Sequence, residues 1–343
     1  FRMCTNCPSK MRGPSIPSVT LTNGQPMPLF GLGTWNAKNE EEVRAALRSA
    51  LDNGYRLIDT AMWYMNERII GTVLKEYFKE GKLRREDVFI TTKLPPTDMY
   101  AQETEKAILS QLEALQLDYI DLYLIHCPVP FKFKDPNNRN LFAVDFIEDL
   151  EHIDTWRIME KYCKLGKLKA LGLSNFSARQ ITDLYAKAEI KPANLQVELH
   201  IYCPQHELQA LCKKLNISVT GYAPIGSPGR KMAAPDRDWP EGDTMSDGVV
   251  VELAKKYKKT PAQIQLRHLI QRGICVIPKS TNPARIMENV RIFDFELSQS
   301  DQQKLLDITK RVRLFLLQNA IGHKHYPYDD VDTAHANSSE AGL

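Results

Sequence analysis

The sequence has no long apolar run and no excess of charge of one sign. A membrane-spanning helix needs about 18 or more consecutive apolar residues, and no stretch of the 343 residues approaches that length. The 45 lysines and arginines nearly balance the 42 aspartates and glutamates, giving a formal net charge of +3. Proteins that bind nucleic acid usually carry a clustered excess of positive charge. We therefore expect neither a membrane span nor a nucleic-acid partner.

Cysteine is scarce and its placement argues against a disulfide framework. The seven cysteines, an odd number, are spread through the chain, as is typical of reduced thiols in an intracellular protein. Cys4 and Cys7 form a Cys-x-x-Cys pair, but no second pair completes a zinc site, so no metal is predicted. The first residues lack the apolar stretch of a secretory signal. Residues 1–17 are expected to form a flexible extension of a cytoplasmic protein, and Phe1 is not expected to be a natural start.

Three signatures of other enzyme classes are also missing. A Rossmann dehydrogenase carries G-x-G-x-x-G between a strand and a helix, whereas Gly31-Leu-Gly33 continues without a third glycine at the required position. A short-chain dehydrogenase carries Tyr-x-x-x-Lys, and none of the 13 tyrosines has a lysine four residues later. A metal-dependent barrel hydrolase needs several ligands at strand ends, and the eight histidines are dispersed.

The sequence does contain a repeated alternation of strand and helix signals. Two short runs flank Asn23-Gly24, a strong hairpin signal. Capping signals, Asn39 with Glu42 and Ser177 with Gln180, begin two of the predicted helices. Eight strands are predicted, near residues 30–33, 55–58, 88–92, 119–125, 169–173, 195–198, 217–222 and 274–277.

So many successive βα units favour a closed barrel over an open sheet. Residues 18–343 are therefore predicted to form a single α/β domain, a (β/α)8 TIM barrel with an N-terminal β-hairpin and a long C-terminal loop. Two longer insertions interrupt the alternation, at residues 129–154 and 226–245.

Four side chains that carry a charge or a proton lie where predicted strands end. Asp59, Lys93 and His126 directly follow predicted strands, and Tyr64 lies five residues beyond Asp59. Function in such barrels concentrates at these strand ends. Singly, the histidine reads as a structural group, the lysine as a surface residue and the aspartate as a helix cap. Together they indicate a reaction site.

The chemistry that joins these groups is reduction of a carbonyl by hydride. The developing alkoxide needs a proton donor, and a phenol with a pKa of about 10 is a weak acid unless its anion is stabilised. A lysine ammonium stabilises that anion, and a paired aspartate keeps the lysine charged. We expect Tyr64 to be the acid, Lys93 and Asp59 to tune it, and His126 to position the carbonyl.

At these residues the chain resembles the aldo-keto reductase family, especially its aldose and aldehyde reductase branch. The resemblance runs from about Val19 to Tyr328 and implies a catalytic tetrad of Asp59, Tyr64, Lys93 and His126. It also implies NADPH/NADP+ bound in an extended form without a Rossmann fold. The matching segments are residues 53–61 with Tyr64, Asn66 and Glu67, then residues 92–94, 124–128, 172–176 and 277–280.

The resemblance implies the cofactor contacts residue by residue. It places the nicotinamide carboxamide at Ser174, Asn175 and Gln196, the nicotinamide ring on Tyr222, and the pyrophosphate under residues 223–227. It places the adenosine 2′-phosphate beside Lys279, Ser280, Asn282 and Arg285, and adenine at Glu288 and Asn289. Lys and Arg beside Ser at a helix start also suit a phosphate, and this interpretation is favoured over the alternative that the two cations are ordinary helix-surface charge. The expected cofactor positions are Thr34, Trp35, Ser174, Asn175, Gln196, Tyr222, Ala223, Ile225, Ser227, Lys279, Ser280, Thr281, Asn282, Arg285, Glu288 and Asn289.

The chain departs from that family around the expected substrate pocket. Cys127 stands where aldose reductases usually carry Trp, and the loop after Lys93 also lacks the common Trp. Residues 311–328 resemble the C-terminal specificity loop, but no cysteine follows Cys275, so the reactive thiol of aldose reductase is not expected there. The expected substrate-lining residues are Trp35, Trp63, His126, Cys127, Phe131 and Leu314.

Two functions of different classes fit these observations. The first is an NADPH-dependent reductase of aldehydes or ketones, sugar aldehydes among them, acting as a monomer. The second is a non-enzymatic member of the same fold, a cofactor-binding regulatory or structural protein, since a fold alone does not determine function. The complete tetrad favours the enzyme.

Overall fold

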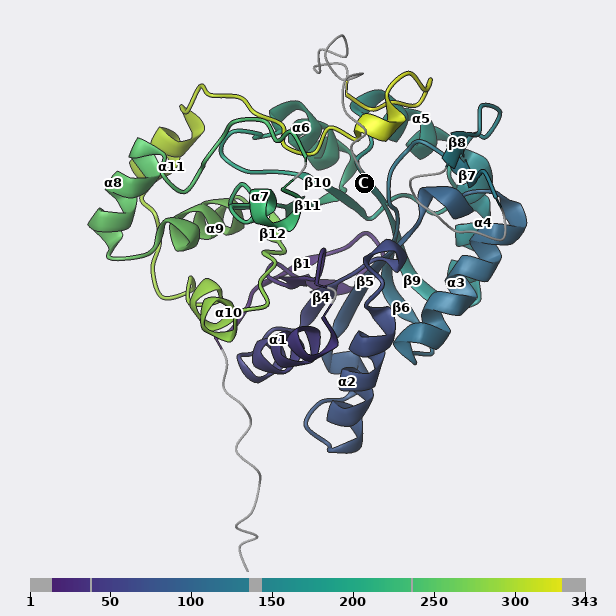
Figure 1. Ribbon diagram of the computed structural model, residues 1–343, viewed down its shortest axis with the longest axis horizontal. Coiled ribbons are helices and arrows are strands. Elements are labelled where there is room, and N and C mark those ends of the chain that lie inside the picture. Colours follow the sequence, from purple (N-terminus) through teal and green to yellow (C-terminus); the bar gives the residue numbers. More distant parts are fainter. Residues whose placement is uncertain (1–13, 38, 136–143, 236, 329–343) are drawn as a thin grey trace, which may run out of the picture.

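Eight parallel strands form the centre of the molecule in this computed structural model, which describes residues 14–37, 39–135, 144–235 and 237–328 (Figure 1). Their order in the sheet is β12-β11-β10-β9-β6-β5-β4-β3. They are β3 (Leu32–Gly33), β4 (Leu57–Asp59), β5 (Phe89–Leu94), β6 (Ile120–Ile125), β9 (Leu168–Ser174), β10 (Asn194–Glu198), β11 (Ser218–Tyr222) and β12 (Cys275–Val276).

Parallel bridges between the first and last strands close the barrel. Phe30 pairs with Val276, and Gly33 pairs with Lys279. The backbone N–H of Gly31 donates to the carbonyl of Val276 at 2.9 Å, and the Val276 N–H donates to that of Leu29 at 2.9 Å. A Cβ on Gly33 would lie 2.5 Å from the carbonyl oxygen of Ile277, so this close approach requires glycine.

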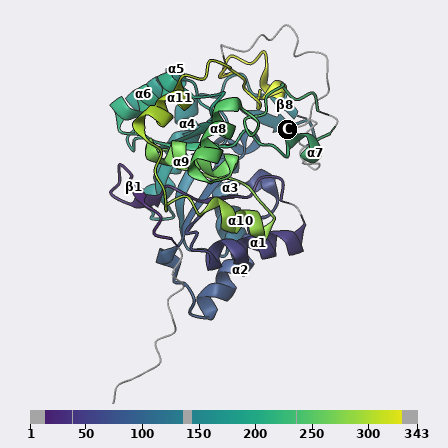
Figure 2. The same ribbon diagram turned by 90° about the vertical axis from the view of Figure 1, so that its left-hand side faces the viewer.

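Helices surround the strands. In both views α1 and α2 lie on one side of the sheet and α5 and α6 on the other (Figures 1 and 2). The helices are α1 (Glu40–Asp52), α2 (Glu67–Lys79), α3 (Ala101–Leu115), α4 (His152–Lys164), α5 (Ala178–Lys187), α6 (His206–Leu215), α7 (Arg230–Ala233), α8 (Gly248–Tyr257), α9 (Pro261–Gln271), α10 (Pro283–Asn289) and α11 (Gln299–Leu306), with 3-10 turns η1 (Met62–Tyr64), η2 (Arg85–Asp87), η3 (Pro96–Asp98) and η4 (Gln318–Ala320).

The predicted (β/α)8 barrel and its N-terminal hairpin are confirmed. Strands β1 (Ser18–Thr20) and β2 (Pro26–Pro28) pair antiparallel around Asn23-Gly24. Asn39 caps α1 by accepting from the N–H of Glu42, and Ser177 with Gln180 forms the capping box of α5. Each strand of the barrel corresponds to one of the predicted runs. The local signals therefore agree with the fold, as expected for a consistent sequence.

Element ends differ from prediction where tertiary contacts decide them. The run predicted at residues 55–58 is a strand only from Leu57, because Tyr55 turns into the core and its hydroxyl donates to the carbonyl of Ile286 at 2.8 Å. Strand β12 is likewise shorter than residues 274–277.

The two insertions form small structures at the edge of the barrel. The first contributes the antiparallel pair β7 (Phe131–Phe133) and β8 (Val144–Phe146), and the second contains α7. Residues 136–143 of the first insertion, Cys4, Cys7 and most of the expected extension at residues 1–17 lie outside the described residues. Cys127, Cys163, Cys212 and Cys275 are free cysteines. In the described part of the chain, every helix is too short or too polar to cross a bilayer.

Candidate active site

The four residues expected at successive strand ends are brought together. Asp59 ends β4, Lys93 lies in β5, His126 directly follows β6 and Tyr64 ends the turn η1. The Lys93 ammonium Nζ donates to Asp59 Oδ1 at 2.6 Å, to the Thr60 carbonyl at 2.8 Å and to the Tyr64 hydroxyl at 3.3 Å. The lysine thus joins the carboxylate to the phenol. The contact with Thr60, a backbone group, could not be read from residue types.

In this cluster, burial and the neighbouring charges shift the pKa values of Lys93 and Asp59 in opposite directions. Burial alone would lower the pKa of Lys93, but the charges of Asp59 and Tyr64 hold it above its ordinary value, so the lysine is an ammonium. Burial raises the pKa of Asp59, while Lys93 and a hydrogen bond from Gln196 offset part of that effect.

The phenol of Tyr64 is a weaker acid than the sequence suggested. Desolvation raises its pKa, and Lys93 acts in the expected direction but compensates only in part. The hydroxyl therefore carries its proton across the neutral range. A proton donor must hold its proton before the reaction, so this state suits the role of an acid.

His126 faces Tyr64 and Trp63. Its ring centroid lies 5.6 Å from that of Tyr64 and 5.8 Å from that of Trp63. Burial lowers the pKa of His126 well below its ordinary value, and Lys93 lowers it further, so the imidazole is neutral. His126 Nδ1 and Trp63 Nε1 are buried, and neither has a hydrogen-bond partner among the described residues. Buried polar atoms are rarely left unpaired, so both indicate a polar ligand at this point.

One residue from across the barrel and one from the loop after the neighbouring strand β3 support the tetrad. Gln196 in β10 donates through Nε2 to Asp59 Oδ2 at 2.7 Å, and the Thr34 hydroxyl donates to the Asp59 carbonyl at 2.9 Å. Both residues were expected to contact the cofactor. Gln196 fixes the carboxylate that holds Lys93, and Thr34 fixes the backbone of the same aspartate, so residues of the expected cofactor site also support the tetrad.

Asn175 lies at the centre of the expected nicotinamide site. Its φ of 63° is left-handed, a conformation that asparagine tolerates. Its Nδ2 donates to the His126 carbonyl at 2.9 Å and to Ser174 Oγ at 3.2 Å. Its Oδ1 accepts from the hydroxyls of Tyr222 at 2.9 Å and Tyr328 at 3.3 Å. These bonds use every donor and acceptor of the amide, so a ligand bonded to Asn175 would replace one of them.

The turn at residues 223–227, which is expected to cover the pyrophosphate, is stabilised by hydrogen bonds from residues that follow it. Ala223 and Ser227 both have positive φ angles, 49° and 45°. Arg230 Nη1 donates to the Gly226 carbonyl at 3.1 Å and Nη2 donates to that of Gly242 at 2.7 Å. The Thr244 hydroxyl donates to the Ile225 carbonyl at 2.8 Å. Residues 240–244 therefore brace the turn.

The residues expected to bind the 2′-phosphate follow β12 in the chain. The side chains of Lys279 and Arg285 reach the solvent. Partial desolvation lowers the pKa of Lys279 most, the charge of Glu42 opposes this, and the charge of Arg285 lowers the pKa further. Asn282 Oδ1 already accepts from the N–H groups of Ala284 at 2.9 Å and Arg285 at 3.2 Å. The N-terminus of α10 is thus capped by its own asparagine. The two cationic side chains remain available.

Other residues expected to bind this part of the cofactor already make hydrogen bonds within the protein. Ser280 Oγ accepts from the Asn282 N–H at 3.1 Å, and Glu288 accepts from the Thr260 hydroxyl at 3.1 Å. Asn289 is buried and Thr281 half-buried. The two exposed cations, close enough to interact, fit the charge of an adenosine 2′-phosphate.

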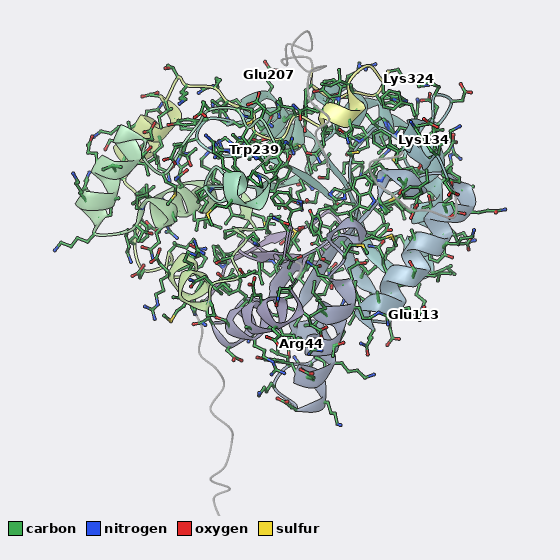
Figure 3. All side chains as sticks on the ribbon, in the orientation of Figure 1. Arg44, Glu113, Lys134, Glu207, Trp239 and Lys324 are labelled. Atoms are coloured by element: carbon green, nitrogen blue, oxygen red, sulfur yellow. The ribbon has the colours of Figure 1, made fainter. Side chains whose placement is uncertain are left out.

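An aromatic cluster is centred on Phe315, which directly follows the expected substrate contact Leu314. The Phe315 ring makes edge contacts with Trp35 at 5.7 Å, Tyr222 at 5.5 Å and Trp239 at 5.5 Å. Figure 3 labels Trp239, which comes from the insertion at residues 226–245. The aromatic composition of this insertion and of the tail was the available signal. Which ring meets which depends on how two distant loops dock.

A buried carboxylate fixes the C-terminal loop to the barrel. Glu198, at the end of β10, accepts from the N–H groups of Leu314 at 2.7 Å and Phe315 at 2.9 Å. It also pairs with His200 Nε2 at 2.8 Å. Leu314 is buried by this arrangement. Glu198 belonged to a predicted strand, and nothing in its local sequence marks it as an anchor for residues more than a hundred positions away.

Two of the expected lining residues, Cys127 and Phe131, have buried side chains. Cys127 is buried, its thiol donates to the Val129 carbonyl at 3.7 Å, and burial raises its pKa to about 12. Phe131 packs in a small cluster with Val129 and Ala320 and stacks on Phe146. Among the described residues no group of three or more His, Cys, Asp or Glu side chains is arranged to hold a metal.

Comparison with known proteins gives a consistent result. A model of the aldo/keto reductase family matches residues 29–310. Aldo-keto reductase family 1 member A1 of Gallus gallus is 41% identical over 326 residues, covering 91% of this chain and 97% of that protein. The Homo sapiens protein of the same name is 40% identical over 323 residues, covering 91% and 98%. The structure of the aldose reductase from Schistosoma japonicum superposes with a TM-score of 0.81 at 39% identity, covering 92% of this chain and 99% of that one.

Proposed function

The chain belongs to the aldo/keto reductase family, and we propose that it reduces aldehydes or ketones to alcohols with NADPH, using Tyr64 as the proton donor. The observation that carries this proposal is the contact at 3.3 Å between the Tyr64 hydroxyl and Lys93, whose ammonium is held by Asp59 at 2.6 Å. A neutral imidazole completes the cluster.

In this proposal each residue has one task. NADPH, when bound, supplies the hydride. Tyr64 gives its proton to the carbonyl oxygen as negative charge develops there. Lys93 stabilises the phenolate that remains, and Asp59 keeps Lys93 charged and in place. His126 is neutral, so its buried ring N–H orients the carbonyl without repelling Lys93.

The first test is turnover of the purified protein with NADPH and an activated aldehyde such as 4-nitrobenzaldehyde. Loss of absorbance at the reduced-nicotinamide band, dependent on the aldehyde, supports the enzyme. If NADPH binds, seen as quenched protein fluorescence, but none of a panel of aldehydes, ketones and sugar aldehydes is reduced, the non-enzymatic alternative is favoured instead. The panel also tests the wider proposal that sugar aldehydes are among the substrates.

NADPH is proposed over NADH because Lys279 and Arg285 are two exposed cations close enough to interact. Lys279→Ala is expected to weaken NADPH binding about tenfold to a hundredfold, the size of a lost charge-assisted phosphate contact. NADH, which lacks the 2′-phosphate, should bind the variant as it binds the wild type. Fluorescence titration measures both. Lys255→Ala, an exposed lysine in α8, is the control. Equal loss for the two cofactors would contradict the assignment.

We also propose that the protein acts as a monomer in the cytoplasm. Cys127, Cys163, Cys212 and Cys275 are free thiols, as is usual for proteins of a reducing compartment. The assembly state is tested by light scattering at micromolar concentration, where a dimer mass would contradict the proposal. Cell fractionation tests the location.

A further inference from the structure

Two buried polar side chains follow Tyr64 and have no task in the proposed reaction. Asn66 is fully buried, donates to the carbonyls of Thr34 at 2.9 Å and Ala37 at 3.2 Å, and accepts from the Thr60 hydroxyl at 2.7 Å. These bonds tie together the loops after β3 and β4. Asn66 is thereby accounted for as a structural residue. Glu67, the first residue of α2, is different because it is a buried ionisable group.

Glu67 lies in a buried network on the outer side of β5. Its Oε1 accepts from the Thr92 hydroxyl at 2.6 Å and from Gln111 Nε2 at 2.7 Å. The Gln111 amide also lies 2.9 Å from Thr92 Oγ1 and 3.3 Å from the Lys93 carbonyl. The Tyr123 hydroxyl donates to Gln111 Oε1 at 2.6 Å. Two strands and two helices therefore meet at this carboxyl group.

The directions of these bonds favour an acceptor at Glu67. Tyr123 donates to Gln111 Oε1, which turns the Gln111 nitrogen toward Glu67. Thr92 also donates to Glu67. Two donors thus point at one carboxyl oxygen, and hydrogen bonds of this kind favour the ionised form.

Glu67 is electrostatically coupled to the tetrad through Lys93. Thr92 and Lys93 are consecutive in β5, so their side chains point to opposite sides of the barrel wall. The Lys93 ammonium lowers the pKa of Glu67, while burial, the larger effect, raises it to about 7. Tyr123 in β6 is the other ionisable group that feels Glu67, and Asp98 in η3 acts on Tyr123 as well. Burial raises the pKa of Tyr123 well above its usual range, so that phenol stays neutral.

We propose that Glu67 is a positioning residue of the reduction site, whose charge, acting through Lys93, sets how strongly Lys93 acidifies Tyr64. The inference rests on the proposed function. With Glu67 neutral, the Lys93 ammonium is balanced by Asp59 alone and stabilises the Tyr64 phenolate more. With Glu67 ionised, a second negative charge offsets the ammonium, and Tyr64 becomes a weaker acid.

The sign of the pH effect follows from this coupling. Below the pKa of Glu67 the carboxyl is neutral and proton transfer from Tyr64 is faster. As pH rises through neutrality, Glu67 ionises and the rate falls to a lower plateau, by about threefold to tenfold for a coupling of this kind. His126 does not titrate in this range, because its pKa lies well below its ordinary value.

The test is the single-turnover rate of NADPH oxidation by a saturating aldehyde between pH 6 and 8. Wild type should show one inflection near neutral pH. Glu67→Gln keeps the shape and an oxygen acceptor but cannot ionise, so its rate should be flat and close to the wild-type acid plateau. Glu76→Gln, the same change at a partly exposed carboxylate of α2, should keep the wild-type inflection.

Thr92→Val is a second, independent variant. It removes a hydrogen bond that lowers the pKa of Glu67, so the inflection should move to higher pH. This variant also decides the matter if Glu67→Gln does not fold. The inference is overturned if wild type turns over without an inflection between pH 6 and 8, or if neither variant changes it. If wild type reduces no carbonyl at any pH, it is the proposed function that fails.

Discussion

At the scale of single residues, the Lys93–Asp59 ion pair matters both for the proposed reaction and for the stability of the fold. Lys93 is 1% exposed and Asp59 2% exposed, and their atoms lie 2.6 Å apart. A buried ion pair contributes little net stability, but breaking it by removing one partner leaves an uncompensated charge. The pair is therefore expected to tolerate removal of both charges better than removal of one.

Lys93→Met should lower the free energy of unfolding by about 3–5 kcal/mol, because the Asp59 carboxylate loses its main partner. Asp59→Asn combined with Lys93→Met should lose clearly less than the sum of the two single changes. Urea unfolding of the four proteins measures this coupling. Strict additivity would contradict the account of the pair, and reductase activity should be lost in both variants that lack Lys93.

Residue types at strand ends were sufficient to predict the tetrad, but not its energetics. Asp59, Tyr64, Lys93 and His126 could be grouped because each follows a predicted strand. The sequence did not show that desolvation of the Tyr64 phenol outweighs the effect of Lys93. Burial depends on what surrounds a group, and local sequence does not contain that information.

At the scale of elements, local patterns determined most helices. Caps such as Asn39 lie where expected, and the buried side chains of α1 follow the period of a helix: Val43, Ala46, Leu47, Ala50 and Leu51. Docking of loops was not predictable, since Glu198 holds the backbone of Leu314 and Phe315 through contacts over more than a hundred residues. Such contacts have no period and no local signature.

Helix packing at Gly71 gives a test at this scale. A Cβ on Gly71 in α2 would lie 2.5 Å from backbone atoms of Leu115, at the end of α3. Gly71→Ala gains about 1 kcal/mol of helix propensity, but overpacking against backbone should cost more, for a net loss of about 2 kcal/mol. Gly248→Ala is the matched control, because no atom lies within 4 Å of its Cβ position at the start of α8. It should be neutral or slightly stabilising. Equal effects in thermal unfolding would refute the packing argument.

At the scale of the whole molecule, histidines link the first insertion to the C-terminal loop. The rings of His152 and His325 lie 4.3 Å apart, and those of His323 and His325 lie 5.3 Å apart. His152 Nε2 bonds to the Pro128 carbonyl at 2.6 Å, and His325 Nε2 to that of Leu150 at 3.1 Å. The cluster joins segments about 170 residues apart. Glu148 and Glu151 lie beside it.

This cluster predicts a loss of stability in acid. Burial lowers the pKa of His152 from 6.5 to about 4. The unfolded state therefore binds the proton more tightly, so the stabilising contribution is complete above about pH 6.5 and declines as pH falls toward 4. From this group alone, wild type should lose about 2 kcal/mol between pH 7.5 and 5.

The matched variants are His152→Gln and His206→Gln. His152→Gln still offers a donor to Pro128 but does not titrate, so its loss of stability over the same pH range should be smaller by that amount. His206→Gln changes an exposed histidine at the start of α6 and should retain most of the wild-type pH dependence. Urea unfolding at both pH values decides. An unchanged dependence in His152→Gln would contradict the prediction.

Closure of the barrel is what places these parts around one site. The seam between β3 and β12 brings Gly33 beside Lys279. It thereby places Lys279, which is expected to bind the 2′-phosphate, next to the loop that carries Thr34 and Trp35. The eight strand signals predicted a barrel. The shared use of Gln196 by the tetrad and the expected cofactor site follows only from the closed form.

The most direct test of the central claim is the single-turnover rate of aldehyde reduction by Tyr64→Phe bound to NADPH. The change removes only the phenolic oxygen that lies 3.3 Å from Lys93. Tyr185→Phe, whose hydroxyl lies 3.4 Å from the Leu215 carbonyl away from the tetrad, is the control. The account predicts NADPH binding as in wild type for both variants, wild-type turnover for Tyr185→Phe, and a loss of at least about a hundredfold for Tyr64→Phe. Turnover of Tyr64→Phe within a few-fold of wild type would show that Tyr64 is not the acid.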